Sequence, residues 1–70
     1  MKTRIEKLIE EYENKLTICR REIADLKTEL KNTSQYSWRN DIKKDIARQQ
    51  MKEMILVQAR VDIESLLNYL

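Results

Sequence analysis

The stretch KNTSQYSWRND, residues 31–41, decides whether this chain of 70 residues forms one long helix or two. The chain contains no Gly and no Pro, so the usual helix breakers are missing. Instead, the stretch gathers small polar residues whose side chains favour turns and helix ends: Asn32, Thr33, Ser34, Ser37 and Asn40. We expect Asn32 to end one helix in the left-handed region. We expect Ser37, or alternatively Thr33 or Ser34, to cap the next.

On the N-terminal side of this stretch, apolar residues repeat in an unbroken heptad pattern. Their spacing alternates between four and three residues over four heptads: Ile5, Ile9, Tyr12, Leu16, Cys19, Ile23, Leu26 and Leu30. The next positions in the same register, Thr33, Ser37, Asn40 and Lys44, are all polar. An apolar a/d seam of this kind is typical of helices that pair as in a coiled coil. The pattern predicts a helix over about residues 2–32 with one apolar stripe.

On the C-terminal side, a second helix is predicted over about residues 38–69, and it carries two apolar lines. One line is interrupted by Gln49, Glu53 and Arg60, and contains Ile42, Ile46, Leu56, Ile63, Leu67 and Leu70. The other line contains Ala47, Met51, Met54 and Val61. We favour a rotation that turns Met51, Met54 and Val61 inward and leaves the three polar residues at the solvent edge. The alternative places the polar residues inside, as a layer that sets register or partner choice.

These elements predict an all-α fold: a single antiparallel helical hairpin over residues 1–70, with a turn at about 33–37. One helix can cover only one face of the second, so the other apolar face needs a further partner. We expect a homodimer that forms a four-helix bundle in the manner of a coiled coil. The rival fold is one continuous helix in a long parallel coiled coil. The loss of the seam after Leu30 argues against it.

The composition excludes most chemistry. The chain has no His and one Cys, so it lacks an activated nucleophile and a zinc ligand set. Without Gly it has no phosphate-binding loop. We therefore expect no enzymatic activity, no cofactor and no small-molecule substrate. No apolar run approaches a membrane span, and the lone Cys19, expected in the core, suits a reducing compartment, so we expect a cytoplasmic protein without membrane contact.

The candidate binding residues lie at the turn end and on the second helix: Trp38, Arg39, Lys43, Arg48, Met51, Met54, Ile55 and Val57. Methionine-rich apolar patches adapt to irregular protein surfaces, and Trp and Arg dominate interface hot spots. The patch at Met51 to Val57 is interpreted as the dimer core or as a docking face for another protein. Trp38 either folds back over Leu30 as a hydrophobic plug or stays exposed as an anchor.

Charge suggests a second hypothesis. Residues 18–52, which fold together as the turn end, hold nine basic and five acidic residues, a net charge of +4, whereas the whole chain carries +2. The layout is similar to that of Rop, a plasmid RNA-binding family of two-helix chains that dimerise into four-helix bundles. We expect a module that binds and blocks or scaffolds a partner protein, with nucleic-acid binding by the basic end as the alternative. Small, charged, Gly-free helical chains are common among phage and mobile elements, which we take as a hypothesis of origin.

Overall fold

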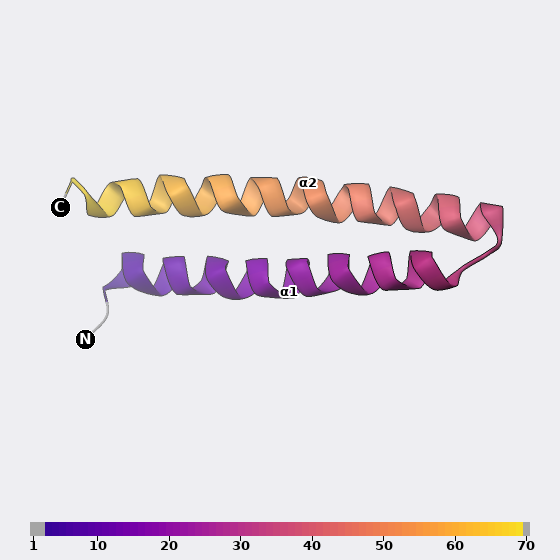
Figure 1. Ribbon diagram of the computed structural model, residues 1–70. Helices are drawn as coiled ribbons and strands as arrows, with labels where there is room; N and C mark the ends of the chain where they lie inside the picture. The colour runs from indigo at the N-terminus through magenta and orange to yellow at the C-terminus, as the bar shows by residue number, and fades with distance from the viewer. Residues whose placement is uncertain (1–2, 70) are drawn as a thin grey trace.

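The computed structural model describes residues 3–69, which form two helices side by side in opposite directions (Figure 1). Helix α1 spans Arg4–Asn32 and α2 spans Tyr36–Leu67. The chain reverses through residues 33–35, so the two ends of the described chain lie at the same end of the hairpin (Figure 1). The molecule measures 53 × 19 × 11 Å, one helix layer thick. The predicted all-α hairpin is confirmed, and a continuous helix is excluded.

Helix α1 begins with a reciprocal cap. The backbone N–H of Glu6 donates to Thr3 Oγ1 at 3.2 Å, and Thr3 Oγ1 donates to Glu6 Oε1 at 3.2 Å. This arrangement satisfies one of the free N–H groups at the helix start and places a carboxylate near the positive end of the helix dipole. The predicted start at residue 2 lies outside the described residues.

The turn differs from the prediction in both of its caps. Asn32 is the last helical residue, and no described residue has a positive φ, so the left-handed stop is wrong. Helix α2 starts at Tyr36, two residues earlier than expected, after Gln35, which makes no side-chain cap bond. Ser37 therefore lies inside the first turn rather than capping it. Helix α2 also ends at Leu67, two residues before the predicted end.

An arginine closes the turn instead. Arg39 Nη1 donates to the carbonyl of Leu30 at 2.8 Å and to the carbonyl of Thr33 at 2.9 Å. The last carbonyls of a helix have no partner within it, and a charged donor is a strong one. Arg39 thus ties the start of α2 to the end of α1, which fixes the direction in which α2 returns.

The core is a single line of contacts between the helices. The buried residues are Leu16, Cys19 and Ile23 from α1 and Ile42, Ile46 and Leu56 from α2. The remaining members of the predicted α1 seam are half-buried: Ile5, Ile9, Tyr12, Leu26 and Leu30. All eight seam positions therefore face α2, as the heptad pattern predicts.

The rotation of α2 is the main correction. Gln49, Glu53 and Arg60 are half-buried on the side that faces α1, whereas Met51 and Met54 are exposed, as is Val61. The favoured rotation is wrong, and the polar residues lie on the inner line. Buried Ile42, Ile46 and Leu56 determine this line. Steps of three and four residues from them also reach the three polar positions.

Within the described residues, neither helix has a segment long and apolar enough to cross a lipid bilayer.

Candidate protein-binding surface

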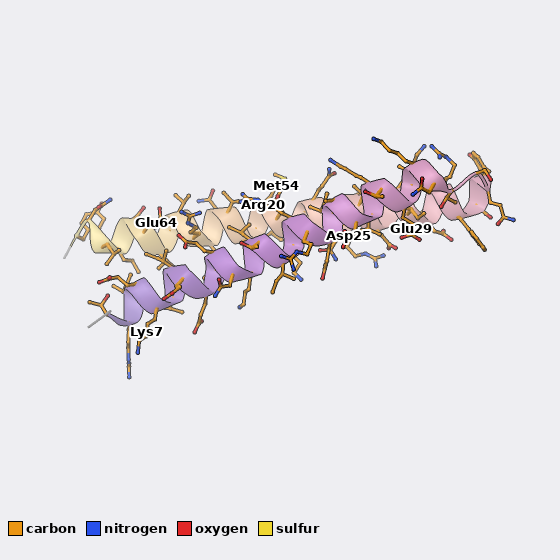
Figure 2. All side chains as sticks on the ribbon, turned by 60° about the horizontal axis from the view of Figure 1, so that its bottom comes forward. Lys7, Arg20, Asp25, Glu29, Met54 and Glu64 are labelled. Carbon is orange, nitrogen blue, oxygen red and sulfur yellow. The ribbon has the colours of Figure 1, made fainter. Side chains whose placement is uncertain are left out.

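The outer side of α2, turned away from α1, carries an apolar strip, here called the outer strip. It consists of four side chains that the sequence marked as binding candidates: Met51, Met54 and Ile55 on the outer side, and Val57, 38% exposed, at its edge toward α1. Met54 is 72% exposed, and its side chain projects from α2 on the side away from α1 (Figure 2). The structure brings these four residues together on about two turns of one helix.

The balance between buried and exposed apolar side chains is unusual. Among the described residues, six hydrophobic side chains are buried, and eleven large ones are exposed. Single exposed hydrophobic residues are common on protein surfaces, but adjacent ones mark interaction sites. The side chains of the outer strip lie next to one another in this way. The hairpin alone therefore leaves much of its apolar surface in water.

Two ion pairs between the helices accompany the rotation that leaves the strip outside. Arg20 Nε lies 3.0 Å from Glu53 Oε2, and Arg60 Nη2 lies 3.3 Å from Glu13 Oε1. Arg60 Nε also donates to Glu64 Oε1 at 2.8 Å on its own helix. Each inter-helix pair joins a charged residue that flanks the apolar seam of α1 to a polar residue on the inner line of α2. Rotating α2 to bury the strip would break both pairs.

A thiol contact supports the same rotation. Cys19 Sγ donates to the backbone oxygen of Gln49 at 3.3 Å, and the side-chain Oε1 of Gln49 lies at 3.5 Å. Cys19 is buried, as expected of a core residue, and Gln49 covers it. A buried thiol of this kind is chemically inert. Within the described residues, the acidic and cysteine side chains form no cluster that could hold a metal ion.

The turn end presents a second candidate surface. Trp38 is 62% exposed, and Tyr36 is exposed beside it, so the plug interpretation of Trp38 is wrong. Arg39 instead donates a hydrogen bond to the backbone carbonyl of Leu30. Trp38 instead lines an open hollow of about 300 Å³ with residues 32–35 of the turn. This arrangement leaves an aromatic ring available at the tip of the hairpin.

The basic candidates do not form one patch. Arg39 is committed to the turn carbonyls, and Arg48 lies 3.8 Å from Asp45 on its own helix. Lys43 and Arg48 are both exposed but five residues apart, so they point about 140° apart around α2. A nucleic-acid backbone is usually followed by a stripe of cations on one face. The geometry of these three residues gives no such stripe.

Sequence reasoning alone missed two functional features of this surface. It named Arg39 as an anchor, whereas Arg39 holds the turn. It also favoured a rotation that turns Met51 and Met54 inward, whereas both are exposed. The spacing of charged residues carried a signal for the rotation of α2. Glu13 and Arg20 lie seven residues apart, as do Glu53 and Arg60, so in an antiparallel pair each acidic residue lies opposite a basic one. No protein-family model matches the chain, and neither a curated protein nor a solved structure matches it.

Proposed function

We propose that this chain is a non-enzymatic, cytoplasmic protein–protein interaction module that acts as a homodimer of hairpins, a four-helix bundle. In this proposal, the bundle binds a partner protein and blocks or joins the surface it covers. The observation that carries the proposal is the outer strip, where Met51, Met54 and Ile55 are exposed together although the core of the hairpin is small.

Physical chemistry supports a docking role for the strip. Burying a Met or Ile side chain that would otherwise face water contributes about 1.5–3 kcal/mol. The strip holds four apolar side chains on one helix, so covering it would add stability comparable to that of a small domain. Methionine adjusts its rotamers to an irregular partner, which suits a surface used for binding.

The turn end of the hairpin suits the binding of a partner protein. Trp38 is a large ring with few rotatable bonds, exposed beside the open hollow at the turn. Aromatic residues in such positions carry a large share of binding energy in protein interfaces. We therefore assign the outer strip to assembly and the turn end, with Trp38 as the anchor, to the partner protein.

The assembly is tested by light scattering on two matched variants. Met54→Asp places a charge in the outer strip and should yield a monomer. Ile18→Asp places the same charge on an exposed apolar position of α1 and should leave the dimer intact. Circular dichroism checks that both variants keep their helices. A wild-type monomer, or a dimer unaffected by Met54→Asp, would contradict this assignment.

The partner is tested by capture from an extract of the native host. The immobilised wild-type protein should retain a protein that Trp38→Ala does not retain, while Trp38→Ala keeps the helix content and the dimer mass. Mass spectrometry then identifies that protein. If wild type and Trp38→Ala retain the same set, the turn end is not the anchor.

Nucleic-acid binding is the competing outcome, tested by mobility shift with RNA and DNA duplexes. It would require a complex that weakens steeply with salt. It would also require that replacing Lys43, Lys44 and Arg48 by Ala abolishes the complex. With Arg39 bonded to the turn carbonyls and Lys43 on a different side of α2 from Arg48, we expect no complex at moderate salt.

A further inference from the structure

We infer that the occupant of the outer strip is the α2 helix of a second copy of this chain, lying antiparallel, so that the turn end of each hairpin lies beside the open end of the other. The inference rests on the homodimer proposed above and adds its polarity. Three properties of α2 carry it: the position of the strip, the distribution of charge on either side, and the area that the single hairpin exposes.

The first property is position. The outer strip runs from Met51 to Val57 and so centres near residues 54 and 55. A two-fold axis at this point lays the strip of one copy on the strip of the other. The interface would then be isologous, the commonest arrangement for homodimers. A two-fold axis along the helices would also superpose the strips, so position alone leaves the polarity open.

The second property, charge, decides the polarity. Residues 36–52, the N-terminal half of α2, hold five basic and two acidic residues, a net charge of +3. From residue 53 to residue 67, α2 holds one basic and three acidic residues, a net charge of −2. Antiparallel copies place the basic half against the acidic half, whereas parallel copies place like charges together. Complementary potentials select partners and orientation in this way.

Individual exposed residues follow the same symmetry. Arg48 lies seven residues before Ile55, and Asp62 lies seven residues after it, about 10.5 Å on either side. Both side chains are exposed, and neither contacts α1 through an ion pair that the structure shows. In an antiparallel dimer centred near Ile55, Arg48 of each copy lies across from Asp62 of the other.

The third property is area. The single chain exposes 5889 Å² of accessible surface, whereas a compact monomer of 8.5 kDa exposes about 4,700 Å². The excess is therefore about 1,200 Å² per chain. A standard protein interface removes about 800 Å² from each partner, and homodimer interfaces are often larger. The hairpin thus exposes the surplus that a stable dimer would cover.

The polarity is tested by cross-linking between small exposed positions on the outer side of α2. Ala47→Cys and Ser65→Cys are prepared separately, one of them with a size tag, and treated with a short bis-maleimide. In the antiparallel dimer, positions 47 and 65 of opposite copies differ by about 3 Å along the axis, whereas identical positions are about 24 Å or more apart. The mixture should give a cross-linked heterodimer, and each variant alone should not cross-link.

The wild-type protein is the control, because its buried Cys19 should not react. Strong cross-linking of each variant with itself would show a parallel pair, which overturns the polarity and leaves the proposed dimer standing. A dimer mass without any cross-link places the interface elsewhere and overturns the inference. A monomer overturns both the inference and the dimer, while capture through Trp38 still tests the partner independently.

A charge exchange gives the second test. Arg48→Glu and Asp62→Lys should each weaken the dimer about tenfold in Kd, measured by sedimentation, because each opposes like charges across the two-fold axis. The protein carrying both changes should dimerise nearly as well as wild type. Each exchange should keep the helix content, because both residues are exposed. Additive weakening in the double variant would overturn the antiparallel pairing.

Discussion

Leu16 is the residue whose truncation tests the core most directly. It is 1% exposed and lies in the cluster formed with Cys19, Ile23 and Leu56. Replacing a buried Leu by Ala costs about 2–5 kcal/mol, and the cost falls where neighbours can close the cavity. The hairpin is only 11 Å thick, with solvent on both broad faces, so partial collapse is easy. We therefore expect about 2.5 kcal/mol for Leu16→Ala, in the lower part of that range.

That loss is large for a chain of this size, because a small single core supplies about 3–5 kcal/mol. Unfolding 70 residues carries an entropy of about 150 cal/mol/K near the melting point, so 2.5 kcal/mol lowers Tm by about 17 °C. The assay is thermal circular dichroism at one chain concentration, because association raises the apparent Tm.

The matched control is Leu8→Ala, since Leu8 lies on the same helix but is 42% exposed. We expect it to cost less than about 1 kcal/mol, or under about 7 °C in Tm. Equal losses for the two variants would refute the assignment of the core to the a/d seam. A small loss for Leu16→Ala would show that the packing around Leu16 differs from the structure described.

The other predictions concern the turn and the inter-helix contacts. Arg39→Ala should lower the stability by about 1–2 kcal/mol in urea unfolding, because two carbonyls lose a charged donor. Arg39→Lys should restore only part of it, since an ammonium lacks the planar fork, and full recovery would show that charge alone suffices. Trp38→Ala should change Tm by less than about 5 °C, as expected of an exposed ring; a larger fall would favour a structural role. A double-mutant cycle with Arg20→Ala and Glu53→Ala should give a coupling of about 0.5 kcal/mol that declines in high salt, and zero coupling at low salt would remove this pair from the forces that orient α2.

The sequence predicts α1 well for a physical reason. Its inner positions are all apolar and its flanks mostly charged, so only one rotation buries the apolar stripe. Leu16 and Cys19, at the centre of the seam, are also the most buried of residues 3–69. The sequence also predicts two helices rather than one, because the four polar seam positions that follow Leu30 cannot continue a dry interface.

The rotation of α2 could not be predicted in the same way. Its apolar residues lie on more than one side, so hydrophobicity alone favours burying Met51 and Met54. The structure instead buries Ile42 and Ile46, which continue the line to Leu56. Two ion pairs between the helices accompany this rotation, since charges on α1 meet opposite charges on α2. The turn has a similar explanation, since Arg39 caps α1 from the other helix.

This arrangement would stabilise a monomeric hairpin poorly. Polar side chains at Glu53 and Arg60 occupy the protected line, while Met51, Met54 and Ile55 face water. In natural sequences, the preference of each residue for burial or exposure rarely contradicts its place in the fold in this way. The conflict disappears if α2 has two interfaces: one with α1 that includes ion pairs, and an apolar one with a further helix that adds stability. The polar residues on the inner line of α2 and the apolar residues on its outer side are therefore the strongest physical reason to expect an assembly. The opposite charges of the two halves of α2 give that assembly a direction.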